Sequence, residues 1–159
     1  MKKTLFLMLA LAAVLVSCDK SSDQEAPQEK KIESADYCGT LSVEASSGLF
    51  TQDNIIVAYN ATDKADSASV TLFQVKFAPR MPVSLDVTIP EITVTRTEKG
   101  GVLTVDSVVP FALGTRYPNY TVKDFEGEIV DNEITFSLKF GSTPTSYRGL
   151  LIEEDDKEQ

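Results

Sequence analysis

Three carboxylates, Asp124, Glu126 and Glu128, alternate within one short stretch of the chain. Alternate residues of a β-strand share a face, and their Cα atoms lie about 6.6 Å apart. Carboxylates at comparable separations do the chemistry of glycosidases. However, the intervening Phe125 and Gly127 look like the core-facing set, which points the three acids to solvent. The chain also lacks histidine, the commonest general base. We therefore predict that the protein is not an enzyme.

Other patterns that would carry catalysis or metal binding are missing from the sequence. It has no Gly-rich phosphate loop, no nucleophile elbow and no Cys/His spacing typical of a metal site. Asp53, Asp63 and Asp66 could hold a calcium ion loosely, although aspartates in turns are far more often simply solvated. We expect no cofactor and no metal site.

Residues 110–119 form the longest connection between expected strands that carries bulky side chains. Phe111, Arg116, Tyr117 and Tyr120 lie in it or beside it and combine three aromatic rings with one cation. Binding residues concentrate on loops held by rigid scaffolds. Aromatic faces supply apolar area, and arginine supplies a forked donor for a carboxylate or a sugar hydroxyl. We predict that these four residues line the ligand-binding site. The alternative is that Phe111 and Tyr120 plug the end of a barrel while Arg116 pairs with an acid.

The first eighteen residues end in a cysteine whose surroundings predict covalent lipidation. Lys2 and Lys3 precede twelve apolar residues, 5–16. This run is too short to span a bilayer, which needs about 20 residues, but it fits the apolar region of a signal peptide. Residues 15–18, Leu-Val-Ser-Cys, resemble a bacterial lipobox, so we predict a signal peptide over 1–17 and a lipid-anchored Cys18. The alternative is an ordinary secretory signal with an accidental cysteine.

The composition divides the remainder into a tether, one domain and a tail. Residues 18–36 are mostly polar and are expected to form a disordered, lipidated tether. Residues 37–152 have the size and the apolar content of a single domain, and residues 153–159 form an acidic tail. The net charge of −9 repels phosphate backbones, so nucleic acid is an unsuitable partner. With Cys18 lipidated, Cys38 lacks an intramolecular disulfide partner, and we expect it to be a small buried residue.

Nearly all of this domain is expected to form β-strands, because apolar and polar residues alternate along it. The expected strands are 40–46, 54–60, 69–78, 83–89, 91–97, 102–109, 120–130, 133–140 and 147–152. Gly100-Gly101 and Asp131-Asn132 are typical of hairpin turns, whereas Pro90 must lie at a strand edge or bend. No stretch shows helical periodicity with caps.

Eight or nine strands joined mostly by short links favour an antiparallel up-and-down barrel. Eight strands form a barrel whose interior just accommodates side chains or one small ligand. Closure also removes the edge strands that a chain rich in Val, Ile and Thr would otherwise expose. A β-sandwich has the same signature in the sequence and is the alternative.

Glycines within the expected strands support closure and point to a family. The two ends of the domain share a Tyr-x-Gly-x-Leu pattern, at residues 37–41 and 147–151, and residues 125–129 read Phe-Glu-Gly-Glu-Ile. Glycine within a strand marks a bend or a close approach of two backbones. Together with the lipobox and the acidic tether, this order of motifs resembles the calycin-like, or lipocalin-like, domain of bacterial surface lipoproteins. The resemblance implies an eight-stranded barrel and no established reaction.

Three kinds of function remain after these exclusions. The first is a non-enzymatic binding module for a small hydrophobic or carbohydrate ligand, tethered to the membrane through Cys18. The second is a structural or interaction subunit, whose solidly packed barrel docks a larger envelope complex. The third, a hydrolase, is disfavoured by the missing histidine. The expected location is the outer membrane of a Gram-negative bacterium, in either leaflet.

Overall fold

The computed structural model describes residues 32–153, and these residues form an all-β domain. The signal peptide, Cys18, the tether up to residue 31 and the tail after residue 153 lie outside the described residues. The strands are β1 (Ala35–Ala45), β2 (Gly48–Ala61), β3 (Ser67–Val75), β4 (Leu85–Thr97), β5 (Gly100–Val108), β6 (Phe111–Ala112), β7 (Thr115–Arg116), β8 (Val122–Val130), β9 (Glu133–Phe140) and β10 (Thr143–Leu151). One 3₁₀-helix, η1 (Pro118–Tyr120), precedes β8. Among the described residues, no helix has the length and apolar character needed to cross a bilayer.

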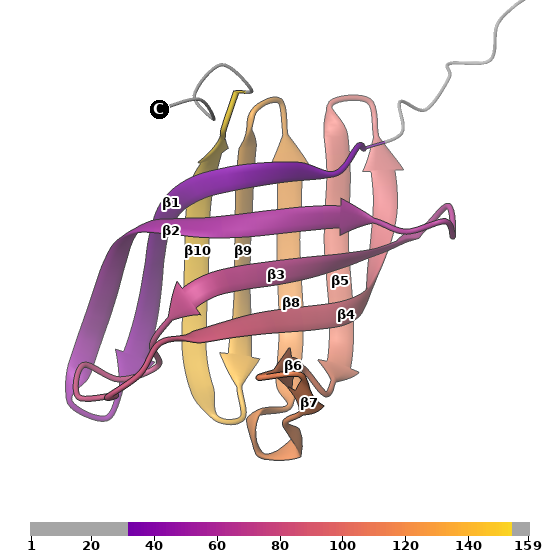
Figure 1. The fold of residues 1–159 in the computed structure, drawn as a ribbon. Helices are drawn as coiled ribbons and strands as arrows, with labels where there is room; N and C mark the ends of the chain where they lie inside the picture. Colours follow the sequence, from indigo (N-terminus) through magenta and orange to yellow (C-terminus); the bar gives the residue numbers. More distant parts are fainter. Residues whose placement is uncertain (1–31, 154–159) are drawn as a thin grey trace, which may run out of the picture.

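Eight of the strands close into an antiparallel barrel (Figure 1). The ring runs β3-β2-β1-β10-β9-β8-β5-β4, and pairing of β3 with β4 completes it. The short hairpin β6–β7 joins the edge of β4 outside the ring. The prediction of an eight-stranded up-and-down barrel is therefore confirmed, and the sandwich alternative is excluded.

The barrel interior is filled by the alternate residues that the sequence pattern assigned to the core. Strand β9 shows the pattern most clearly, with Ile134, Phe136, Leu138 and Phe140 all buried. Its polar residues point outward between them, as the two-residue period of a strand requires. Strands from all around the ring contribute to this one hydrophobic core.

Strands β1, β2 and β4 bend sharply and carry the sheet around the corners of the barrel. In Figure 1, β3 runs across the view while β8, β9 and β10 run along it, and β1, β2 and β4 pass from one direction to the other. The register of β1 against β2 shifts between Gly39 and Leu41. The register of β4 against β3 also shifts beside Pro90, where Glu91 has φ 57°. Such bulges increase local bending and allow a sheet to close.

The observed boundaries differ from the expected ones in two places. Strand β4 continues through Pro90, because the proline sits at the bend, whereas the sequence suggested two separate strands. The folded domain also begins earlier than residue 37, since β1 starts at Ala35 and Ile32 packs against the core.

The expectation that Cys38 is buried is wrong. Cys38 is half-buried and belongs to the outward-facing set of β1, because its neighbour Tyr37 faces the core. Its cross-strand neighbours are Leu150 on β10 and Ile56 on β2, both exposed. An apolar row therefore crosses three strands on the outer face of the barrel.

Candidate functional site

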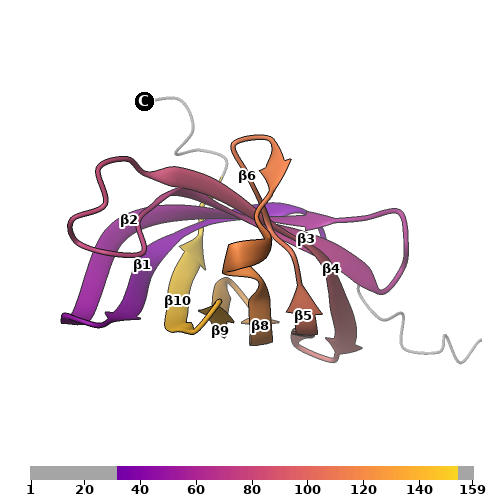
Figure 2. The same ribbon diagram turned by 90° about the horizontal axis from the view of Figure 1, so that it is seen from below.

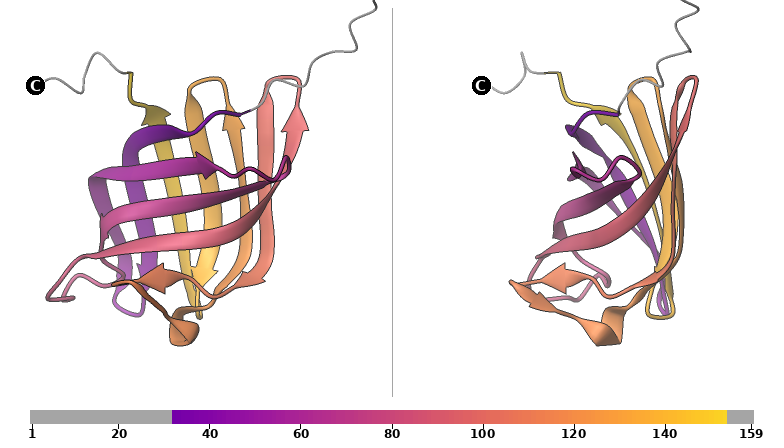
Figure 3. Two further views of the ribbon diagram at one scale, coloured as in Figure 1. Left: turned by 45° about the vertical axis from the view of Figure 1, so that its right-hand side comes forward. Right: turned by 90° about the vertical axis from the view of Figure 1, so that its right-hand side faces the viewer.

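One end of the barrel, which we call the mouth, is covered by three chain segments. These are residues 76–84 between β3 and β4, residues 109–121 between β5 and β8, and the β9–β10 turn (Figure 2). The Tyr117 amide donates to the Pro110 carbonyl at 2.9 Å, which folds the second segment back on itself. The Gly141 amide donates to the Thr121 carbonyl at 2.9 Å and ties that segment to the β9–β10 turn. In Figure 3 the β6–β7 hairpin and η1 both lie at this end.

The mouth holds a mostly apolar pocket of about 460 Å³. Its lining residues are Phe77, Ala78, Arg80, Met81, Leu85, Val87, Pro110, Ala112, Tyr117, Tyr120, Phe140 and Thr143. Val87 and Phe140 are almost fully buried and form the floor, whereas Tyr120 is 47% exposed at the rim. Pockets of roughly 300–1,000 Å³ with apolar and aromatic walls are typical of small-molecule sites.

Aromatic contacts hold the pocket wall in place. The Phe77 ring lies 4.4 Å from the Phe140 ring and 6.3 Å from the Tyr120 ring, measured between centroids. The Tyr120 and Tyr117 rings are 6.2 Å apart. Ring pairs at such separations attract one another beyond the area they bury. The wall is therefore a connected aromatic cluster contributed by three segments that are distant in sequence.

The structure separates the four predicted binding residues into two pairs. Tyr117 and Tyr120 line the pocket, as expected from the sequence. Phe111 and Arg116 instead face each other across the β6–β7 hairpin and are not among the lining residues. The Arg116 guanidinium carbon lies 5.0 Å from the centroid of the Phe111 ring, a cation–π contact on the outside of the mouth.

Arg80 is the residue that sequence reasoning missed. It lines the pocket from the β3–β4 connection, within the sequence Pro79-Arg80-Met81-Pro82. The two prolines are typical of a break between strands, and this stretch lies between the expected strands 69–78 and 83–89. The sequence offers one weak signal for this residue, a cation between two prolines in a connection between apolar strands. Nothing in the local sequence indicates that this connection folds over the mouth.

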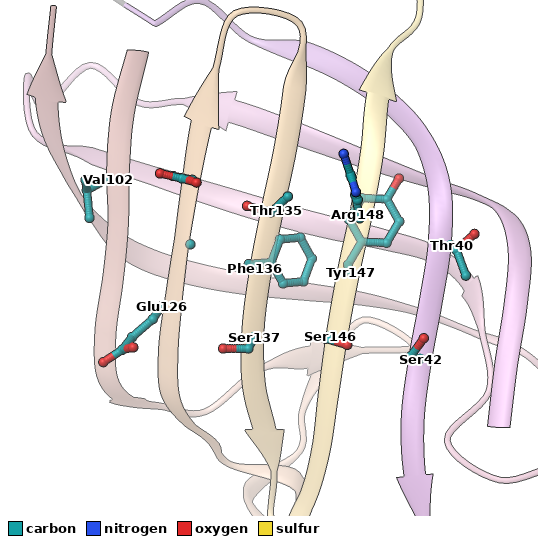
Figure 4. A pocket seen from close by; sticks show the side chains of 12 residues that line it. Thr40, Ser42, Val102, Glu126, Thr135, Phe136, Ser137, Ser146, Tyr147 and Arg148 are labelled. Atoms are coloured by element: carbon teal, nitrogen blue, oxygen red, sulfur yellow. The ribbon is translucent and has the colours of Figure 1, made fainter. Parts of the chain in front are cut away.

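A second hollow, of about 590 Å³, lies on the outer wall of the barrel (Figure 4). Ser42, Ser146, Ser137 and Glu126 form one row of directly paired residues across β1, β10, β9 and β8. The hollow exists because these serines are short while the neighbouring carboxylates and Arg148 are long. Its lining combines hydroxyl and carboxylate groups with Val102, Phe136 and Tyr147, but it is more open to solvent than the mouth pocket and would enclose a ligand less completely. We therefore take the mouth pocket as the better candidate site.

The three carboxylates of β8 are on the outer face, as their alternation with core-facing residues predicted. Glu126 and Glu128 line the outer hollow. Asp124 forms an ion pair with Lys139 at 2.8 Å, and the Lys139 hydrogen bond lowers the pKa of the Asp124 carboxyl. The same hydrogen bond raises the pKa of Lys139. Both side chains are exposed, so the pair contributes little to stability.

The part of the chain that the structure describes contains no cluster of three or more potential metal-ligating side chains of the His, Cys, Asp or Glu type. Asp53 instead accepts a hydrogen bond from the Thr40 hydroxyl at 2.8 Å. Asp63 and Asp66 belong to the β2–β3 connection. The three aspartates considered for calcium are thus not assembled into one site.

Comparisons of the chain with protein-family models, with curated proteins and with solved structures found no match. The geometry of the mouth is therefore the main indication of function.

Proposed function

We propose that this protein is a lipid-anchored, non-enzymatic binding module of the bacterial cell envelope. The mouth of its barrel would hold a small hydrophobic ligand. The observation that carries this proposal is the apolar, aromatic-walled pocket of about 460 Å³ at one end of an otherwise packed barrel. A ligand seated there would take the exposed apolar area of Tyr120 and its neighbours out of water.

The position of the chain start supports presentation of the mouth away from a membrane. Ile32, the first described residue, contacts Gly101 near the β4–β5 turn, at the end of the barrel opposite the mouth (Figure 1). The Ile152 amide donates to the Asp36 carbonyl at 2.9 Å, so β10 ends at this same side. Thirteen residues lie between Cys18 and Ile32, so the two are at most about 50 Å apart when this segment is extended. An anchor on Cys18 would therefore attach the domain through the end opposite the mouth. The proposed location is the outer membrane of a Gram-negative bacterium.

Lipidation at Cys18 is tested by comparing the two cysteines of the chain. In a Gram-negative host supplied with radiolabelled palmitate, wild type and Cys38→Ala should incorporate label and sediment with membranes. Cys18→Ala should lose both the label and the membrane association, because the only other cysteine, Cys38, does not follow a lipobox sequence. Continued labelling of Cys18→Ala would refute the anchor.

Ligand binding at the mouth is tested by filling the pocket. Ala78 lines the pocket, and Val83 lies in the same connection, is 58% exposed and does not line it. The neutral apolar fluorophore N-phenyl-1-naphthylamine should bind wild type with increased fluorescence. Ala78→Trp should weaken that binding by roughly tenfold or more, equivalent to about 1.4 kcal/mol, while Val83→Trp should leave it unchanged. Equal binding by all three proteins would mean that the fluorophore does not use the mouth.

A second candidate function, docking to a larger envelope complex, is favoured by the apolar row on the outer face. Leu150 is 62% exposed and Ile56 42% exposed, on either side of Cys38. Large apolar side chains that adjoin on a surface often mark contact sites for other proteins. The fluorophore experiment separates the two candidates, because docking through this row does not need the mouth pocket.

A further inference from the structure

The charged groups around the mouth pocket indicate which ligands it would select. Of the described residues that line the pocket, only Arg80 is charged, and none is acidic. This composition is unusual for the chain, which has 24 acidic residues and only 15 basic ones. Acidic residues lie elsewhere, for example on the outer wall, where Glu126 and Glu128 line the outer hollow.

The four arginines of the domain differ in what their side chains contact. Arg96 donates to the Ala65 carbonyl at 2.7 Å, and Arg148 pairs with Glu133 at 2.8 Å. Arg116 lies over the Phe111 ring. Within residues 32–153, the Arg80 side chain has neither a hydrogen bond nor an ion pair to another residue. A guanidinium presents five donors in a planar fork that matches a carboxylate or a sulfate, and at Arg80 this fork is free for a ligand.

From this arrangement we propose that the mouth selects amphipathic monoanions, with Arg80 as the partner of the anionic head. The proposal rests on the proposed binding function and names its ligand class. The apolar body packs against the aromatic wall formed by Phe77, Tyr120 and Tyr117, and the head stays at the rim beside Arg80. A head placed there keeps part of its hydration, so the cost of burying a charge is small.

The net negative charge of the protein does not prevent the pocket from selecting an anion, because this selection depends on direct contact with Arg80. Exposed charges are screened over about 8 Å at physiological ionic strength. A head group in contact with Arg80 therefore experiences mainly that guanidinium, since none of the lining residues is acidic. Uncharged amphiphiles of the same length gain only the apolar contacts, and cationic ones are in addition repelled by the Arg80 guanidinium.

The test compares three amphiphiles that have dodecyl-length chains and different head groups. Dodecanoate, dodecanol and dodecyltrimethylammonium, each below its micellar concentration, compete with N-phenyl-1-naphthylamine for the purified protein. Wild type should bind dodecanoate about tenfold more tightly than dodecanol, and dodecyltrimethylammonium most weakly. Arg80→Gln should abolish the difference between dodecanoate and dodecanol, and Arg80→Lys should retain part of it.

Lys76→Gln is the matched control. Lys76 lies in the same connection, carries the same charge and does not line the pocket, so its variant should keep the full preference for dodecanoate. Unchanged unfolding midpoints would show that all three variants fold. An equal loss of preference in Lys76→Gln and Arg80→Gln would overturn the inference, because the effect would then come from net charge. Displacement by all three amphiphiles at equal concentrations would also overturn it while leaving the binding function intact. If the fluorophore does not bind wild type at all, the binding function itself fails.

Discussion

Gly39→Ala is expected to destabilise the barrel by about 3 kcal/mol or more, in the upper range for overpacking a filled site. Gly39 on β1 pairs directly with Gly149 on β10, where the first and last strands of the ring meet. A Cβ on Gly39 would collide with the Arg148 carbonyl oxygen and lie 2.7 Å from the Arg148 carbonyl carbon. These atoms belong to the backbone of a paired strand, so no flexible side chain can move to make room. The two strands would have to separate at the seam of the barrel.

The measurement is the free energy of unfolding from urea titrations of purified protein. Ser42→Ala is the control, because Ser42 is on the outer face of the same strand and its replacement should change stability by less than about 0.5 kcal/mol. A Gly39→Ala protein as stable as wild type would contradict the close approach of β1 and β10.

Tyr147→Ala is expected to cost about 4 kcal/mol, and Tyr147→Phe about 1–3 kcal/mol. The Tyr147 ring is buried and stacks on the Phe136 ring with centroids 5.2 Å apart. Its hydroxyl donates to the Ile55 carbonyl at 2.9 Å, and the Tyr37 carbonyl oxygen lies at 3.2 Å. The side chain therefore joins β10 to β1 and β2 beside the bend of β1. Alanine removes the ring and the hydroxyl, while phenylalanine leaves the buried carbonyl groups without their hydroxyl donor.

The glycines beside Tyr147 explain why a tyrosine fits there. A Cβ on Gly149 would collide with the Tyr147 hydroxyl oxygen, so the ring lies over Gly149 and occupies the space that a side chain would fill. Urea titrations of wild type and the two variants would separate the contribution of the ring from that of the hydroxyl. Equal losses in Tyr147→Phe and Tyr147→Ala would mean that the ring packing contributes nothing.

Tyr147 also gives the protein a testable response to alkaline pH. Burial raises the pKa of Tyr147 above the ordinary value of 10.0, and the nearby Cys38 thiol raises it further when ionised. A raised phenol pKa means that the folded state holds the proton more tightly than the unfolded state does. The stability that this contributes is complete below pH 10 and decreases as the pH rises above 10 toward the folded-state pKa. Burial also raises the pKa values of Tyr37 and Tyr59. As the pH rises above 10, the free energy of unfolding should therefore decrease less in Tyr147→Phe than in wild type. A smaller decrease should remain in the variant, because Tyr37 and Tyr59 are still present.

Most of the fold could be predicted from the sequence, because the signal for a half-buried strand is local. The alternation of β9, with Ile134 and Phe136 facing inward and Thr135 outward, is visible in the sequence and needs no tertiary information. The same parity correctly placed Glu126 and Glu128 on the outer wall. The Tyr-x-Gly pattern at both ends of the domain favoured closure, and in the closed barrel β1 and β10 are neighbours, with Gly39 paired to Gly149.

The composition of the mouth depended on the tertiary structure. Tyr117 and Tyr120 could be predicted because aromatic residues in a long loop tend to cover the nearest apolar surface. Arg116 was assigned to the site for its charge, but the β6–β7 hairpin directs it to Phe111. Arg80 could not be found, since its connection and residues 109–121 meet only after the barrel has closed.

The pattern of residues alone predicts an all-β chain, a strand count near eight and the side of each strand that faces the core. Those properties follow from a two-residue period that acts within each strand. The tertiary structure decided where the sheet bends, which loops share the mouth and which arginine stands beside the pocket. These outcomes depend on contacts between residues far apart in sequence, such as the Phe77 and Phe140 rings at 4.4 Å. No local pattern encodes such a contact, because it forms only when the ring of strands is complete.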